Sequence, residues 1–264
     1  MAQQRRSVLE RALRILGTFE DGPAGLSLSE LSRRSGVPLT TTYRILGELT
    51  AWGALERDAA GDYRIGLRLW EVAALAPRSV GLQRIALPYM QDLYETTHRS
   101  VHLAVREKEE VVFVERFVSP ESAGERPRVG GRYAMHATAV GLVLLAYAPT
   151  DVQEEVIGGP LKPFTSRTYS NERELRQALS DVRRDGYVIS DRQISLKHVS
   201  VAAPIYGPDS SVVAALSLIV LPSETHGPSL GHLVQATARS ISRALGAPPR
   251  QIHPRSSSDI RKDP

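Results

Sequence analysis

Five consecutive side chains in the N-terminal third carry groups that bind nucleic acid. They are three threonines, one tyrosine and one arginine: Thr40, Thr41, Thr42, Tyr43 and Arg44. Short hydroxyls hydrogen-bond to phosphates, and a guanidinium can read the edge of a base. Such groups near the start of a helix are typical of contacts in the major groove of DNA. We therefore predict DNA contacts for these five residues.

The flanking residues predict two helices joined by a tight turn. Leu28, Leu31 and Ser35 have the spacing of one buried helical face, and Gly36 supplies a stop after them. A second helix, expected to begin at about residues 39–40, has its own buried stripe: Ile45, Leu46 and Leu49. The pattern predicts a helix-turn-helix. The alternative is a solvated helical hairpin with a polar outer face.

The segment after these helices predicts a wing. Residues 53–66 contain two short strand-like runs, 54–57 and 63–65, around a turn with a glycine. A helix-turn-helix followed at once by a hairpin is a winged helix. We expect phosphate contacts from four arginines, two in the first of these helices and two in the wing: Arg33, Arg34, Arg57 and Arg64.

An earlier helix should close this small core. Ser7 and Glu10 have the spacing of a capping box at its start. Arg5 and Arg6, which precede it, form either a basic arm for DNA or a disordered N-terminus.

Composition excludes several other classes of protein. The chain has 264 residues, a formal net charge of +4 and no cysteine, so disulfides, thiol nucleophiles and thiolate metal sites are excluded. Its apolar runs are too short for a membrane span, and its N-terminus does not resemble a signal peptide, so we expect a cytoplasmic protein. No nucleophile elbow occurs, and we expect no enzyme activity, cofactor or metal. His98 and His102 have helical metal-ligand spacing, but the helix is expected to end between them.

The pattern divides the chain into four parts. Residues 1–65 are the winged helix-turn-helix domain, and residues 66–80 are a linker helix whose apolar side chains also suit a dimer interface. Residues 81–246 form a second domain. Residues 247–264, rich in proline, serine and charge, form a disordered tail.

Strands and helices alternate in the second domain. Alternating residues predict hairpins at 101–118 and 199–221, with a third strand within 126–133 and another from 186. Helices are expected at about 79–97, 136–148, 171–184 and 230–245. The sum is an α+β domain built on an antiparallel sheet.

From Ser7 to Gly246 the sequence resembles the IclR family of bacterial transcriptional regulators. The motifs are SLSELSRRSGVPLTTTYRILGELTAWGALER in the first domain, and GGRYAMHATAVGLVLLA, GYVISD and VAAPIYGPDSSVVAALSLIVLPS in the second. The resemblance implies a winged-helix head, a linker helix and a GAF-like effector-binding domain. It also implies dimers or dimers of dimers that bind palindromic operators in double-stranded DNA and respond to small metabolites.

The resemblance also implies where an effector binds. The positions carried over from the family are Ala139, Val140, Asp191, Val201, Ser217 and Ile219. This chain departs from the family pattern beside them: Arg192 and Gln193 replace an acidic pair, and His198 replaces a glycine. The pocket is therefore expected to be more apolar than one that holds a two- or three-carbon acid.

The residue types favour a carboxylate. Unpaired amides at the start of the helix near Thr138 to Val140 attract an anion, Ser217 offers one hydrogen bond, and Ile219 adds an apolar wall. We expect a hydroxylated or aromatic acid, acting on a regulator that represses rather than activates. As alternatives, Val201 and Ile219 are sheet core and Asp191 caps a loop. The whole second domain can also be an enzyme of acyl or sugar chemistry, or a scaffold that only oligomerises.

Overall fold

The computed structural model describes residues 7–20, 25–120, 128–224 and 229–249. The chain divides into two compact units between Val80 and Gly81. Arg5, Arg6 and residues 250–264, for which we expected a basic arm and a tail, lie outside the described residues. Among the helices that are described, none is long and apolar enough to span a bilayer.

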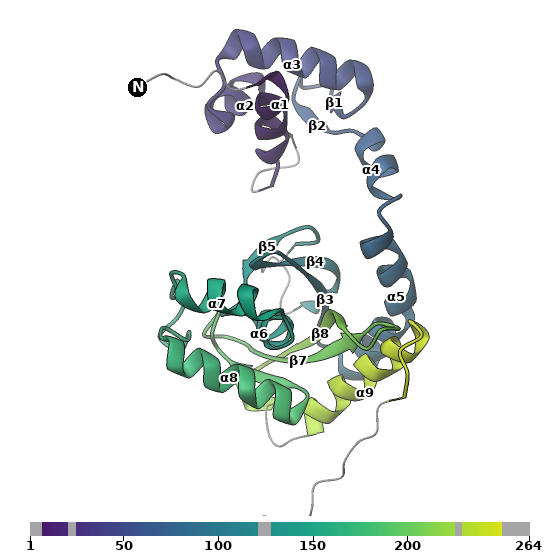
Figure 1. Ribbon diagram of the computed structural model, residues 1–264. Helices are drawn as coiled ribbons and strands as arrows, with labels where there is room; N and C mark the ends of the chain where they lie inside the picture. Colours follow the sequence, from purple (N-terminus) through teal and green to yellow (C-terminus); the bar gives the residue numbers. More distant parts are fainter. Residues whose placement is uncertain (1–6, 21–24, 121–127, 225–228, 250–264) are drawn as a thin grey trace, which may run out of the picture. The chain divides into compact units, whose positions relative to one another are not determined.

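The first unit is a helix-turn-helix with a two-stranded wing (Figure 1), as the sequence predicts. Its elements are α1 (Val8–Gly17), α2 (Leu28–Ser35), α3 (Leu39–Trp52), β1 (Leu55–Arg57) and β2 (Tyr63–Ile65). One core joins them, and its buried members are Ile15, Leu26, Leu31, Val37, Ile45, Leu46, Leu55 and Tyr63. The two strands are antiparallel, and Leu26 exchanges two backbone hydrogen bonds with Tyr63, which ties the wing to the start of α2.

Local capping sets the ends of α2. Ser27 and Glu30 form a reciprocal capping box at its N-terminus, a Ser-x-x-Glu signal that was not among our predictions. Gly36 ends the helix with a φ of 62°, in the left-handed region where a side chain is strained. At α1, the hydroxyl of Ser7 accepts a hydrogen bond from the amide of Glu10, which is one of the two hydrogen bonds of the predicted capping box.

Two helices follow the wing. They are α4 (Leu67–Ala73) and α5 (Pro77–Thr97). We expected the second of these helices to begin at about residue 79, but α5 begins at Pro77, because proline suits the first turn of a helix, where its missing amide donor has no partner to lose. The helix continues through Pro88.

The second unit is built on a six-stranded antiparallel sheet. Its strands are β3 (Ser100–Glu107), β4 (Glu110–Phe117), β5 (Arg132–Ala134), β6 (Val188–Asp191), β7 (Val199–Tyr206) and β8 (Val212–Val220). Their order across the sheet is β5-β4-β3-β8-β7-β6, so the two predicted hairpins pair with each other through β3 and β8. The first and last strands of this unit therefore lie side by side in the middle of the sheet.

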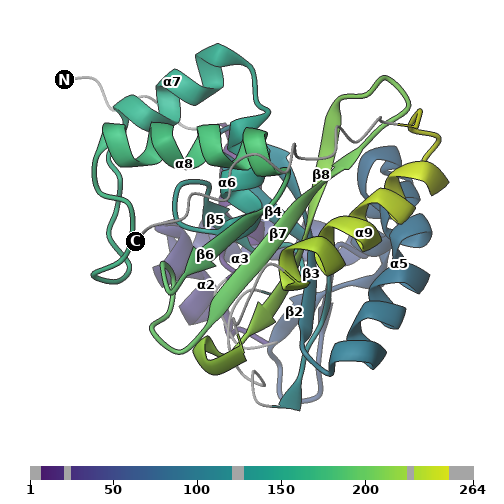
Figure 2. The ribbon, with the colours of Figure 1, turned by 90° about the horizontal axis from the view of Figure 1, so that it is seen from below.

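Helices cover both faces of this sheet (Figure 2). On one face lie α5 and α9 (Ser229–Ala244), with a core that includes Met90, Leu103, Val201 and Leu218. On the other lie α6 (Ala139–Ala146), α7 (Thr150–Gly158) and α8 (Glu172–Asp185). Because both faces are covered, polar side chains in the middle of the sheet, such as those of His102 and Ser217, are buried.

Two predicted boundaries in this unit change, and one helix was not predicted. The helix expected from His136 begins at Ala139, because Thr138 caps it and accepts a hydrogen bond from the amide of Gly141. The third strand runs one residue past the predicted limit, to Ala134. Helix α7 lies in a stretch for which we predicted no element. Asn171 caps α8, which is the helix expected at about 171–184.

Candidate functional site

The exposed face of α3 carries three of the five residues predicted to touch DNA. Thr40, Tyr43 and Arg44 are exposed, with Tyr43 at 64%, and Thr41 is half-buried. Arg44 forms an exposed ion pair of 2.8 Å with Glu48, one turn further along the helix. Such a pair contributes little to stability, so the guanidinium can leave it for a stronger anionic or acceptor partner.

Thr42 is the exception and corrects our prediction. Its side chain is fully buried, and its hydroxyl donates a hydrogen bond of 3.1 Å to the carbonyl of Val37. Ser32 donates to the same carbonyl over 2.7 Å. Thr42 therefore holds the turn between the two helices and does not face DNA, because position 42 lies on the same helical face as Ile45 and Leu46.

The four arginines expected to touch phosphates all lie on the surface. Arg33 and Arg34 are in the last turn of α2. On the wing, Arg57 donates to the carbonyl of Gly61 over 2.9 Å, and Arg64 pairs with Asp58 over 2.8 Å. These contacts fix the direction of the wing arginines, and hydrogen bonds from Ala60 and Asp62 to Asp58 hold the turn between the strands.

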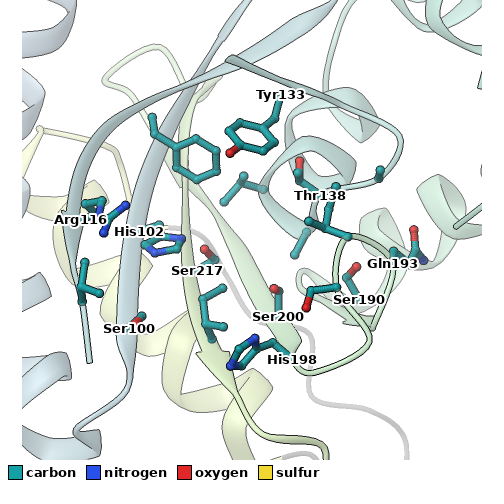
Figure 3. Close-up of a pocket in the computed structure, with 18 residues that line it drawn as sticks. Ser100, His102, Arg116, Tyr133, Thr138, Ser190, Gln193, His198, Ser200 and Ser217 are labelled. Carbon is teal, nitrogen blue, oxygen red and sulfur yellow. The ribbon is translucent and has the colours of Figure 1, made fainter. Parts of the chain in front are cut away.

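A cavity of about 90 Å³ lies in the second unit, between the start of α6 and the sheet. Register explains which strand residues form its floor. Arg116 lies opposite His102, and His102 lies opposite Ser217. In the next row, Ser100 lies opposite Ile219, which lies opposite Ser200. Directly paired residues share a face of a sheet, so polar side chains from β3, β4, β7 and β8 point toward the cavity (Figure 3).

The start of α6 forms one end of the cavity. Ala139 and Val140 both line it, as predicted. Thr138 satisfies the amide of Gly141 through its hydroxyl and that of Leu142 through its carbonyl. The amides of Ala139 and Val140 have no hydrogen-bond partner in the described part of the chain. They are donors at the positive end of a helix, which suits an anion.

The loop from Gln193 to His198 covers another side of the cavity. Two threonines hold its start, since Thr168 donates to the carbonyl of Gln193 over 2.6 Å and Thr165 to that of Arg192 over 2.8 Å. Gln193 is buried, and its Oε1 has no partner among the described residues. The sequence marks Gln193 and His198 only as departures from a family pattern, and the structure makes both of them wall residues.

Ser217 and Ile219 line the cavity as predicted, but Val201 and Asp191 do not. Val201 lies opposite Leu218, on the face covered by α5 and α9, because neighbouring residues of a strand point to opposite faces. For the same reason Ser190 lines the cavity and Asp191 points away. Hydrogen bonds from Arg192, with further help from the nearby Arg167, lower the pKa of the Asp191 carboxyl.

His102 and Arg116 also line the cavity, and neither was predicted. Burial, with a smaller contribution from the positive charge of Arg116, lowers the pKa of His102 to about 3, so its imidazole is neutral at physiological pH. Phe113 packs against the His102 ring edge-on, with ring centroids 5.5 Å apart. The sequence held one signal for His102: Ser100 and His102 are polar residues at alternate positions of one strand, and both faces of that strand are covered.

Comparison with protein families matches both units. Residues 8–59 match the model described as the IclR helix-turn-helix domain, and residues 75–243 match the bacterial transcriptional regulator IclR C-terminal domain. The HTH-type transcriptional regulator XynR of Escherichia coli is 29% identical over 245 residues, 91% of this chain and 97% of its own. The HTH-type transcriptional repressor AllR of Escherichia coli is 30% identical over 251 residues, 93% of each chain.

Solved structures agree with these matches. An IclR homologue from Microbacterium hydrocarbonoxydans, complexed with 4-hydroxybenzoate, is 33% identical and superposes with a TM-score of 0.85, over 90% of this chain and 99% of its own. The IclR protein of Thermotoga maritima has a TM-score of 0.72 at 25% identity, over 90% and 98% of the two chains. These relatives are regulators of transcription, not enzymes. The chain thus belongs to the IclR family of bacterial DNA-binding transcriptional regulators.

Proposed function

We propose that a small organic acid, hydroxylated or aromatic, binds in the cavity beside α6 and changes the affinity of this regulator for its operator. The protein acts in the cytoplasm and represses transcription until the acid binds. The observation that carries the proposal is the cavity itself, because it joins the two unpaired amides of Ala139 and Val140 to the hydroxyl of Ser217 and the apolar wall of Ile219. A related structure with 4-hydroxybenzoate supports this class of ligand.

The acid fits the cavity by its chemistry. Its carboxylate accepts hydrogen bonds from the amides at the start of α6, where the helix dipole adds to the attraction. Its apolar body lies against Ile219, Val140 and Phe113, which all line the cavity. Asp191 points away from the cavity and pairs with Arg192, so its negative charge does not face this carboxylate.

DNA recognition rests on α3 and the arginines around it. Arg44, Thr40 and Thr41 contact base edges, Tyr43 lies beside them, and the four arginines Arg33, Arg34, Arg57 and Arg64 contact phosphates. Two such heads, related by a two-fold axis, read a palindrome whose half-sites are about one helical turn or a multiple apart.

The assembly required for this is a dimer or a dimer of dimers. The linker between the two domains, α4 and the residues that follow it up to Ala76, supplies a surface for it. Trp70 and Leu75 on this linker are 66% and 81% exposed, which is unusual for large apolar side chains outside an interface. Light scattering should show a dimer or tetramer, and a stable monomer with tight operator binding would contradict this part of the proposal.

A binding experiment tests the effector. Calorimetry with 4-hydroxybenzoate on the full chain should show saturable binding to the wild type. Ala139→Phe should abolish it, because Ala139 is buried at the cavity end of α6 and the ring fills the space of the carboxylate. Operator affinity in the absence of acid should not change in this variant. Equal binding by the wild type and the Ala139→Phe variant would place the effector elsewhere.

A further inference from the structure

The cavity has a second polar end, away from the start of α6. Figure 3 shows Arg116 and His102 on one side of the cavity and Thr138 on the other. Arg116 and His102 belong to the neighbouring strands β4 and β3 and lie directly opposite each other, so both side chains reach the same region.

His102 is 7% exposed, yet it is one of the residues that line the cavity. Within the described residues neither of its ring nitrogens has a hydrogen-bond partner, although the ring packs against Phe113. A buried polar group without a partner costs free energy, so a native protein keeps one mainly where something else satisfies it. The unpaired nitrogens of His102 thus point to a polar group on a ligand.

The two ends differ in the hydrogen bonds that they offer. The amides of Ala139 and Val140 can only donate, so a group that only accepts, such as a carboxylate, satisfies them. His102 is neutral, because burial and the charge of Arg116 lower its pKa, and a neutral imidazole has one donor and one acceptor nitrogen. The group that satisfies the acceptor nitrogen must donate a hydrogen bond.

We infer that His102 is a specificity-determining residue that binds a hydroxyl on the ligand, at the end of the molecule opposite the carboxylate. The hydroxyl donates to the unprotonated nitrogen of His102 and can accept from the guanidinium of Arg116. Arg116 is the sole residue with a full positive charge among those that line the cavity in the described chain. A distal carboxylate cannot donate a hydrogen bond to the acceptor nitrogen of His102, so the site takes a monoanion with a distal hydroxyl rather than a dicarboxylate. This inference rests on the proposed function, because it takes the carboxylate to lie at α6.

Three aromatic acids and two variants test the inference. Calorimetry on the full chain should use benzoate, 4-hydroxybenzoate and terephthalate, which differ only in the group opposite the carboxylate. The wild type should bind 4-hydroxybenzoate about tenfold or more tighter than benzoate, because benzoate leaves His102 unpaired. Terephthalate should bind more weakly than 4-hydroxybenzoate.

His102→Phe keeps a flat ring beside Phe113 but removes both nitrogens. This variant should bind 4-hydroxybenzoate more weakly than the wild type does and should bind benzoate with unchanged affinity. The two affinities should then lie within about threefold of each other. His102→Gln, which keeps one donor and one acceptor, should retain part of the preference and serves as the second variant if His102→Phe folds poorly. Ile219→Val, in the apolar wall, is the control and should weaken the binding of benzoate and 4-hydroxybenzoate by the same factor.

Four outcomes would overturn the inference. If His102→Phe weakens benzoate and 4-hydroxybenzoate equally, the carboxylate lies at His102 and the inference is wrong. An unchanged preference in both His102 variants, or tighter binding of terephthalate, would also contradict it. If the wild type binds none of the three acids, the proposed effector class itself is wrong, and the inference fails with it.

Discussion

The polar side chains of α3 and those of the cavity lie in opposite environments. On α3 the side chains of Thr40, Tyr43 and Arg44 are exposed, and the ion pair between Arg44 and Glu48 is open to solvent. In the cavity His102 and Ser217 are buried under α6. Loss of the partner of an exposed polar group costs little folding free energy, because water replaces the partner. A buried polar group without a partner destabilises the fold. Substitutions of the exposed residues of α3 should therefore change DNA binding alone, and substitutions in the cavity should change both ligand binding and stability.

The largest expected effect concerns pH and His102. Burial keeps its folded-state pKa at about 3, below the ordinary value of 6.5, so between these values the unfolded chain binds a proton that the folded chain does not. The free energy of unfolding should therefore fall by about 1.4 kcal/mol for each pH unit as the pH is lowered between these two pKa values.

Unfolding in urea, followed by circular dichroism at about pH 7 and about pH 4.5, should show this loss in the wild type. His102→Phe should lose less over the same interval, by roughly 2 to 3 kcal/mol. The same pH dependence in both proteins would mean that His102 is not held neutral by burial.

Arg44 should give the next largest effect, on DNA alone. Arg44→Ala should weaken operator binding by about 1 to 3 kcal/mol and relax sequence preference, with no loss of stability, because the exposed pair with Glu48 contributes little. Fluorescence anisotropy on operator and on unrelated DNA measures both. Arg64→Ala is the matched control. This variant should bind operator and unrelated DNA more weakly by the same factor, and it should reduce the slope of log affinity against log salt by about 0.9. Operator binding at wild-type strength by Arg44→Ala would mean that α3 is oriented differently.

The two threonines Thr40 and Thr42 separate binding from stability within one helix. Thr42→Val should lower the stability of the first unit by about 1 kcal/mol, since it removes a buried hydrogen bond to Val37. Thr40→Val should leave stability unchanged and weaken operator binding. Thermal unfolding and anisotropy on both variants measure this difference, and a reversed pattern would contradict the assignment of Thr42 to the turn.

Ser217 should give the smallest effect. Ser217→Ala should weaken binding of 4-hydroxybenzoate by about 0.5 to 1.5 kcal/mol, which is the range for one neutral hydrogen bond. Calorimetry would detect it, and Ser200→Ala in the adjacent strand provides a comparison on the same face of the sheet. No change in either variant would place the acid away from the sheet floor.

The helix-turn-helix was predictable because its pattern is local. The buried faces of α2 and α3 follow from a period of about 3.6 residues, and the glycine turn from Gly36 alone. Thr42 was predicted wrongly because its polar type suggested an exposed site, although its position relative to Ile45 and Leu46 places it on the buried face. The spacing carried more information than the residue type.

The cavity was predictable only in part because it depends on pairing between distant strands. Ala139 and Val140 follow from the start of one helix. Val201 was wrongly assigned to the cavity. Its neighbours Ser200 and Ala202 face the cavity side of the sheet, and Val201 faces the other side, because a shift of one residue along a strand reverses the face. His102 and Arg116 meet only through the register of β3 with β4, which no local pattern in the sequence specifies.

The most direct test joins the two regions in one measurement. An acid changes operator binding only if it has different affinity for the DNA-competent and the DNA-incompetent states. Anisotropy of labelled operator should be measured with the wild type and with Ala139→Phe, with and without saturating 4-hydroxybenzoate. We predict that the acid weakens operator binding by the wild type and has no effect on Ala139→Phe. Saturable binding of the acid to the wild type without any change in operator affinity would contradict the proposed coupling between the cavity and DNA.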